Sequence, residues 1–240
     1  IQMATINAAS WQGLDHIGVI APGKLADLAI IDGNLEDMKV TQVFLKGDLV
    51  AADGNLLINL PAYQYPNSVK KSVKRAPIIA EDLMVPTDKT GKVSVNCIGL
   101  ILDQNLSEAI LTEMETDGGF VKPGLKADLL PIAVVGRHGQ SDIGKTFVQG
   151  FNMAHGAMAE TVSHDTHNII VVGTNYQDMT VAVNRVIEMQ GGVVLAKEGQ
   201  VIGDLPLRIG GLMTDELNAH DLTKKMAYLT QLANEELDCQ

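Results

Sequence analysis

The chain has 240 residues, of which 46% are hydrophobic, and it carries a formal net charge of -11. This length allows one large domain or two modest ones, each with its own core. The acidic balance argues against a nucleic-acid or anionic-membrane partner, because phosphate binding requires clustered Lys and Arg. The two cysteines lie too far apart in the sequence to suggest a disulfide framework or a cysteine metal site, so we expect a cytoplasmic protein.

Residues 1–58 read as the end of a helix followed by a small antiparallel sheet. Apolar residues at helical spacing begin at Ile1, so we expect the chain to be the C-terminal part of a longer protein. Residues 18–32 combine a Pro-Gly turn with β-formers, and residues 40–50 read as strand, Lys-Gly-Asp turn and strand. Residues 59–75 shift to Pro, Tyr, Ser, Lys and Arg, which predicts a linker with a solvated basic end.

Residues 76–240 mix strands and helices without strict alternation, which is typical of an α+β domain. Turn residues separate the apolar runs along most of this region. We predict strands around Ile78 and at 93–102, 129–135, 156–163 and 168–172, and a helix at 143–153.

The last third of the chain carries the clearest helix signals. Thr174 or Asn175 can cap a helix whose apolar stripe runs to the glycine pair at 191–192. Residues 193–207 predict a hairpin turning at 197–200. A closing helix is predicted at 215–237, with these side chains facing inward: Leu217, Leu222, Met226, Leu229 and Leu232.

Residues 139–146 match the phosphate-loop pattern GxxxxGK[ST] and follow an apolar strand. In such a loop Lys145 would neutralise phosphate charge and Thr146 would reach Mg²⁺. No later apolar strand ends in an aspartate suitable for holding that ion. A P-loop nucleotide-binding protein therefore stands as one alternative, and a glycine-rich turn leading into a helix as the other.

The stretch TVSHDTHN at 161–168 concentrates polar chemistry in eight positions. His164 and His167 could face one metal ion, but a site needs three or four ligands and would have to recruit Asp165. A cytidine-deaminase site is excluded, because no His-x-Glu or Cys-x-x-Cys is present. Two further interpretations remain: a well-satisfied hairpin turn, and a surface that faces a substrate.

Two parts of the chain resemble a known enzyme family. Residues 7–14, 18–32 and 43–50 resemble the end of a metal-dependent amidohydrolase, where the last barrel helix gives way to a small β-sandwich. The stretches 137–139, 143–144, 147–151, 156–157, 161–175, 182–185 and 191–192 are similar to the C-terminal domain of bacterial adenine deaminases. The resemblance implies an α+β fold, with a small β-sandwich remnant followed by a mixed C-terminal domain.

The resemblance also implies a function for the full enzyme, which would hydrolyse adenine to hypoxanthine and ammonia. Its divalent metal, manganese or iron with zinc as a further candidate, would be held by barrel residues before Ile1. We therefore expect no catalytic residue and no bound metal in this chain, which alone would be inactive. The alternative from another class is a non-catalytic assembly or interaction domain.

The resemblance further implies how the chain meets its partners. Sheet edges left open by the missing sandwich strands predict a homo-oligomer. The polar turn and the loop after the 129–135 strand are expected to face the substrate or the barrel. The residues concerned are Arg137, His138, Ser163, His164, Asp165, His167 and Asn168.

Overall fold

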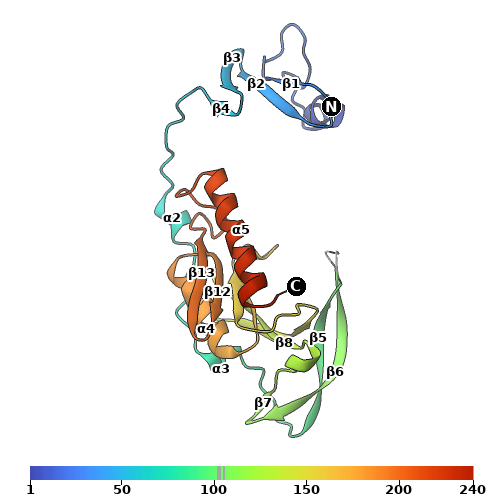
Figure 1. Cartoon of the computed structure of the whole chain (residues 1–240), viewed down its shortest axis with the longest axis vertical. Helices are drawn as coiled ribbons and strands as arrows, with labels where there is room; N and C mark the ends of the chain where they lie inside the picture. The colour runs from blue at the N-terminus through green and yellow to red at the C-terminus, as the bar shows by residue number, and fades with distance from the viewer. Residues whose placement is uncertain (102–103, 105, 240) are drawn as a thin grey trace. The chain divides into compact units, whose positions relative to one another are not determined.

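The computed structural model describes every residue except 102, 103, 105 and 240, and it consists of two compact units (Figure 1). These units are Ile1–Gln64 and Tyr65–Gln240. Helices and strands are mixed without regular alternation along the chain, so the predicted α+β class is confirmed.

The first unit is a short helical segment followed by a small antiparallel sheet, in the order that the sequence predicts. Its described strands lie in the order β1-β2-β3-β4. Among the described residues of this unit only Ala9 is a buried apolar residue, so both faces of the sheet lack a packed layer. The elements are η1 (Gln2–Ala4), α1 (Ile6–Trp11), β1 (Leu28–Asp32), β2 (Lys39–Leu45), β3 (Asp48–Ala52) and β4 (Asn55–Leu56).

The described residues of the second unit build one sheet of nine strands in the order β13-β12-β10-β11-β8-β9-β5-β6-β7. Neighbouring strands are antiparallel except β5 and β9, which run parallel. The strands are β5 (Lys92–Leu100), β6 (Ser107–Asp117), β7 (Phe120–Val121), β8 (Leu130–Val135), β9 (Ile143–Gln149), β10 (Ala157–Glu160), β11 (Ile169–Gly173), β12 (Gly192–Lys197) and β13 (Gln200–Pro206). The helical segments are α2 (Asn67–Lys70), α3 (Ala80–Leu83), η2 (Leu125–Ala127), α4 (Tyr176–Glu188) and α5 (Ala219–Glu236).

The helix predicted after Asn175 is confirmed as α4, and it packs on one face of the sheet. The side chain of Asn175 caps it by accepting a hydrogen bond of 2.8 Å from the backbone N–H of Asp178. Its apolar stripe, including Met179 and Val183, is fully buried against β10, β11 and β12. The hairpin predicted at 193–207 is confirmed as β12 and β13.

Helix α5 lies on the opposite face of the sheet, over β12 and β13 (Figure 1). It begins at Ala219, where the side chain of Asn218 accepts a hydrogen bond from the N–H of Asp221. Leu229 is buried, and Leu222 and Leu232 pack at the edge of the same apolar cluster. The prediction was wrong for Leu217, which precedes the helix, and for Met226, and both stay exposed.

The helix predicted at 143–153 is a strand, β9, in the interior of the sheet. Phe147 and Val148 point to opposite faces and both are buried, so the apolar pattern lacks the alternation that reveals a half-buried strand. The phosphate-loop match therefore leads into a strand. The ammonium of Lys145 donates a hydrogen bond to the carbonyl of Asp82 at 2.8 Å, and both interpretations of this motif were wrong.

Two other predicted strands have different outcomes. Ile78 is buried but lies outside any strand; its N–H donates to Asn184 Oδ1 at 2.9 Å, which fixes the segment before α3. The strand predicted at 93–102 is confirmed as β5 to Leu100, while residue 102 lies outside the described residues.

The basic end of the predicted linker is only partly solvated: Lys71 and Lys74 are exposed, but the segment packs at other positions. Val73 is buried, and its N–H donates to Gln190 Oε1 at 3.2 Å. The N–H of Lys74 donates to the carbonyl of Arg137 at 2.7 Å, and Lys70 forms an ion pair with Asp215. We call residues 69–75 the strap, because these contacts hold them against the rest of the second unit.

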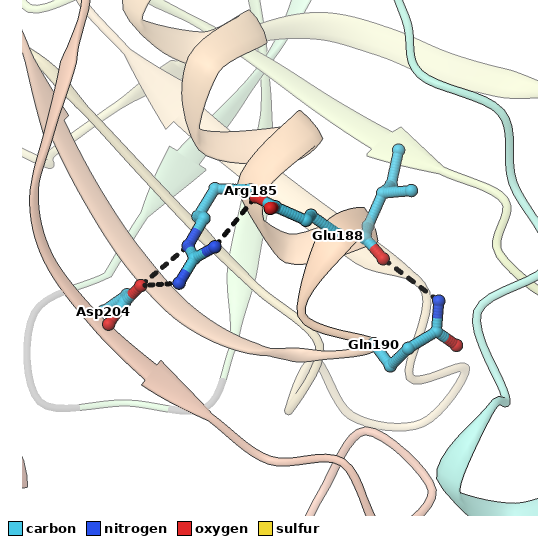
Figure 2. Close-up of polar contacts among 5 residues, drawn as sticks. Arg185, Glu188, Gln190 and Asp204 are labelled. Carbon is cyan, nitrogen blue, oxygen red and sulfur yellow. Dashed lines mark hydrogen bonds and ion pairs between the residues drawn. The ribbon is translucent and has the colours of Figure 1, made fainter. Parts of the chain in front are cut away.

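The C-terminal end of α4 is fixed to its surroundings by a polar network (Figure 2). The guanidinium of Arg185 donates to Asp204 on β13 at 2.7 Å and to Glu188 at 2.8 Å. Hydrogen bonds to these carboxylates raise the pKa of Arg185. The side chain of Gln190 donates to the carbonyl of Ile187 at 3.1 Å and accepts from the N–H of Val73 in the strap. The end of α4 is therefore bonded both to β13 and to the strap. Within the described part of the chain, no helix combines the length and apolar character needed to cross a bilayer.

Candidate functional site

The polar stretch 161–168 forms the connection between β10 and β11, and we call it the histidine turn. The two strands are antiparallel, and Glu160 opposite Ile170 is their last pair before the turn. Because Ile169 pairs with Val135 at the end of β8, the residues that follow β8 lie at the same end of the sheet. The fold thus places Arg137 and His138 beside the turn.

Direct contacts join the β8 loop to the turn. The N–H of Arg137 donates to Asn168 Oδ1 at 3.2 Å, and its guanidinium Nε donates to the carbonyl of His167. The ring Nε2 of His138 lies 3.3 Å from the carbonyl oxygen of Thr166. These two segments, distant in sequence, therefore form one cluster.

Arg137 differs from the rest of the cluster because its side chain is 2% exposed. Besides His167, its guanidinium donates to Ser72 Oγ at 2.9 Å and to the carbonyl of Gly210 at 2.7 Å. Each of these acceptors is neutral, and burial lowers the pKa of Arg137. Since the group joins the turn, the strap and the segment after β13, it fixes the position of the turn.

The outer part of the turn is open to solvent. His164 and Asp165 are 83% and 82% exposed, and His164 Nδ1 pairs with Asp165 Oδ1. The His164 and His167 rings meet edge to face, with centroids 5.7 Å apart and planes at 90°. The N–H of His167 donates to the carbonyl of Ser163 at 2.7 Å, which closes the turn. The turn thus exposes imidazole and carboxylate groups to solvent, while the buried Arg137 side chain holds its backbone.

His167 carries an unsatisfied polar atom. Its ring Nδ1 is buried and has no hydrogen-bond partner among the described residues. Leaving such an atom unpaired costs about 1–3 kcal/mol. A further donor or acceptor at this ring would therefore stabilise the turn.

The turn does not fit a metal ion. Outside residues 102, 103, 105 and 240, no group of three or more His, Cys, Asp or Glu side chains is placed to hold one. The two imidazole planes are perpendicular, and the Asp165 carboxylate is directed at His164. The side chains of this chain thus do not supply the three or four convergent ligands that a metal site needs.

The base of the turn is rigid and closely packed. Thr161 is fully buried; its hydroxyl donates to the carbonyl of Gly211 at 2.6 Å and accepts from the N–H of Gly192 at 2.8 Å. A Cβ on Gly191 would lie 2.5 Å from the Cα of Gly211. These short approaches require glycine, and they hold the start of the turn against the end of α4.

Glu160, the last residue of β10, was not singled out from the sequence. Its side chain is half-buried beside Ile170 and Val193, which flank it on the neighbouring strands. It has no hydrogen-bond or ion-pair partner in the described part of the chain, and burial raises its pKa. A charged residue closing an otherwise apolar strand, Ala-Met-Ala-Glu, is the signal that could have found it.

Glu160→Gln is expected to make this chain more stable at neutral pH, because the variant removes a half-buried charge. A carboxyl whose folded-state pKa is raised costs stability above that pKa, and the cost disappears as the pH falls toward the ordinary range of glutamate. The gain should therefore shrink on acidification. Thermal melting over a series of pH values measures it. Glu81→Gln is the matched control, because Glu81 on α3 is exposed; an equal gain there would contradict the assignment.

The larger hollows of the second unit lie away from the turn. One of about 530 Å³ lies between α5 and β13, and one of about 460 Å³ lies beside β6 and η2. A more polar hollow of about 220 Å³ lies at the N-terminal end of α4. Residues 161–168 line none of these three.

Comparison with known proteins matches two family models to separate parts of the chain. Residues 104–240 match the model of the adenine deaminase C-terminal domain, and residues 1–50 match that of the amidohydrolase family. Adenine deaminase 1 of Carboxydothermus hydrogenoformans is 53% identical over 240 residues, which are 100% of this chain and 40% of that protein. The adenine deaminase of Desulforamulus reducens is 41% identical over 241 residues, again 100% of this chain and 40% of the relative.

A more distant relative, the adenine deaminase of Staphylothermus marinus, is 37% identical over 220 residues, with 90% of this chain and 36% of that protein covered. The chain thus spans about 40% of the length of the curated relatives it matches. The domain model alone covers more than half of the chain. The chain belongs to the adenine deaminase C-terminal domain family.

Proposed function

We propose that this chain is the C-terminal portion of an adenine deaminase that hydrolyses adenine to hypoxanthine and ammonia. The observation that carries the proposal is the similarity to proteins named adenine deaminase over the full 240 residues. Within this portion, residues 1–58 would end the amidohydrolase part, residues 59–75 would connect, and residues 76–240 would form the C-terminal domain. The strap, although within the connection, packs with the C-terminal domain.

The reaction replaces the amino group of the purine by oxygen from water. The divalent metal of the amidohydrolase family, manganese, iron or zinc, would supply an activated water for that attack. Because the described residues of this chain do not fit a metal, we assign its ligands to the rest of the enzyme. The chain alone would then be inactive.

We assign the histidine turn to the surface that faces the substrate or the barrel. The exposed residues available for contact are His138, His164 and Asp165; Ser163 and His167 are only partly accessible, and Asn168 is already engaged by the N–H of Arg137. A purine edge presents both hydrogen-bond donors and acceptors, and a buried purine needs partners for them. Arg137, being buried, would act through the turn as a positioning residue.

His164→Ala in the full-length enzyme tests this assignment. We expect kcat/KM for adenine to fall about tenfold, the effect of one lost hydrogen bond of roughly 1.4 kcal/mol. The free energy of unfolding should change by no more than about 0.5 kcal/mol, because an exposed side chain contributes little. Steady-state kinetics and thermal melting of the same preparation give both values.

His220→Ala is the matched control, since His220 is also an exposed histidine but lies at the start of α5. It should leave both kcat/KM and stability unchanged. Equal proportional losses of activity and stability in His164→Ala would instead favour a turn that is only structural. Unchanged kinetics in His164→Ala would remove the turn from the proposed site.

A homo-oligomer is also proposed, on a separate observation. The sheet of the first unit buries neither face among its described residues, and β1 and β4 are edge strands. Exposed apolar side chains there include Ile30, Leu45 and Leu56. Such surfaces and edges favour association. Light scattering of the full-length enzyme after size-exclusion chromatography measures the subunit number, and a monomer at all concentrations would contradict the proposal.

A further inference from the structure

One face of the second unit's sheet is covered over only part of its width. Residues that pair across neighbouring strands lie on the same face of the sheet, as do alternate residues along one strand. Ile98 pairs with Val148 and Val148 with Leu130, which shares its face with Val134 on β8. Val134 pairs with Ile170, and Ile170 pairs with Glu160. Leu111 on β6 and Met158 on β10 share this face by the same register. We call these six side chains the open face: Ile98, Leu111, Val134, Met158, Glu160 and Ile170.

The face that carries the open face also bears a buried apolar cluster, so only part of it is accessible. On the other face Val135, Phe147, Ile169 and Val171 are fully buried, and α3 and α4 contribute to that cover. The open face is shared with α5, but that helix contacts β12 and β13 at one edge of the sheet. The six side chains of the open face remain partly accessible, and Leu111 is 70% exposed. Covering these partly accessible side chains would remove further apolar surface from water.

Charge on and beside the open face limits what can cover it. Glu160 lies among Met158, Ile170 and Val193 without a cation or N–H donor in the described part of the chain. Glu113 and Glu115 follow Leu111 at alternate positions of β6, so their carboxylates lie on the same side of the sheet. A covering surface would have to be apolar with basic or N–H donor groups opposite these carboxylates.

We propose that the open face is the docking surface for the part of the amidohydrolase portion that lies outside this chain, with an arginine or lysine of that part paired to Glu160. This inference rests on the proposed function. The open face is continuous with the histidine turn, because Glu160 directly precedes Thr161. A partner that meets the turn therefore reaches the open face as well. More than half the length of the relatives lies outside the region matched by this chain, which provides a partner of sufficient size.

A second copy of this chain fits the open face less well. The chain carries a net charge of -11, and a copy seated on this face would have to supply the basic groups. Like charges across an interface cost several kcal/mol. A second copy is thus the occupant that the charges disfavour.

Carboxylate footprinting tests the proposal on the full-length enzyme and on the 240-residue chain. A water-soluble carbodiimide couples an amine to accessible carboxylates, and mass spectrometry gives the labelling rate of each. We expect Glu160 and Glu113 to be labelled severalfold more slowly in the full-length enzyme than in the chain. Glu81 on α3, at the covered face, should be labelled equally in both.

Equal labelling of Glu160 and Glu113 in the two proteins would overturn the proposal. Protection that appears in the 240-residue chain as its concentration rises would also overturn it, in favour of a second copy. Leu111→Asp should restore labelling of Glu113 and Glu160 in the full-length enzyme. The side chain is exposed in the chain alone, so a failure to fold is not expected there.

Adenine turnover of the same preparations separates this inference from the proposed function. A full-length protein that deaminates adenine but leaves Glu160 fully reactive contradicts the docking surface alone. A protein that protects Glu160 without deaminating adenine supports the surface and contradicts the proposed function.

Discussion

Gly192→Ala is expected to lower the free energy of unfolding of the second unit by about 4 kcal/mol, as backbone strain and overpacking add. Gly192 has φ +137, which side-chain-bearing residues rarely adopt, and it starts β12. An added Cβ would lie 2.0 Å from the carbonyl oxygen of Leu205 and 2.7 Å from Met189 Cε. The backbone oxygen belongs to a paired strand, so neither side can move without breaking the β12–β13 ladder.

The consequence should reach the histidine turn. The N–H of Gly192 donates to the hydroxyl of Thr161, and its carbonyl accepts from the N–H of Thr161 at 3.0 Å. Displacing residue 192 therefore displaces the residue that starts the turn. In the full-length enzyme we expect Gly192→Ala to reduce adenine turnover even below its melting temperature.

Gly210→Ala is the matched control for this prediction. Gly210 also has a positive φ, +64, but no atom lies within 4 Å of the position that its Cβ would take. This variant should lower the free energy of unfolding by about 1 kcal/mol, which is the cost of the left-handed conformation alone. Calorimetric unfolding of the chain measures both variants. If Gly192→Ala lowers the free energy of unfolding no more than Gly210→Ala does, the backbone at Leu205 can move away from the added Cβ at little cost.

Local sequence signals were sufficient for the elements next to the candidate site. Helix α4 combines a capping Asn175 with an unbroken apolar stripe and a Gly-Gly stop, and each signal acts within a few residues. The β10–β11 and β12–β13 connections carry turn residues between apolar runs. The position of the histidine turn could therefore be predicted.

The arrangement around the turn depends on contacts between distant residues, which a single sequence does not reveal. The burial of Val73 depends on Gln190, and that of Arg137 on the strap and on Gly210. Strand β9 was predicted as a helix because its burial on both faces removes the period of two. The lack of a polar partner for Glu160 can be recognised only from the strand pairing, which places Ile170 and Val193 beside it.

Arg137→Met is expected to lower the free energy of unfolding by about 3 kcal/mol, because it leaves buried acceptors without a donor. The acceptors are Ser72 Oγ and the carbonyls of His167 and Gly210, which belong to three separate segments. Methionine fills a similar length of space but provides no hydrogen bond. Chemical denaturation of the chain, followed by circular dichroism, measures the loss.

Arg208→Met is the control for the loss of an arginine as such. Arg208 is about half exposed and pairs with Glu216 at 2.9 Å on the surface. Exposed ion pairs contribute about 0–1 kcal/mol, so this variant should remain close to the unmodified chain. Similar losses in the two variants would mean that the Arg137 guanidinium contributes no more than a surface charge.

Arg137→Lys in the full-length enzyme distinguishes a positioning residue from one that binds substrate. Lysine keeps the positive charge, but its single ammonium cannot span the three acceptors that the planar guanidinium reaches. If Arg137 contacted adenine directly, the variant would raise KM while the unfolding transition stayed in place. Because the guanidinium is buried beneath the turn, we expect the opposite order: stability falls, hydrogen exchange at residues 161–168 accelerates, and kcat falls with KM nearly constant.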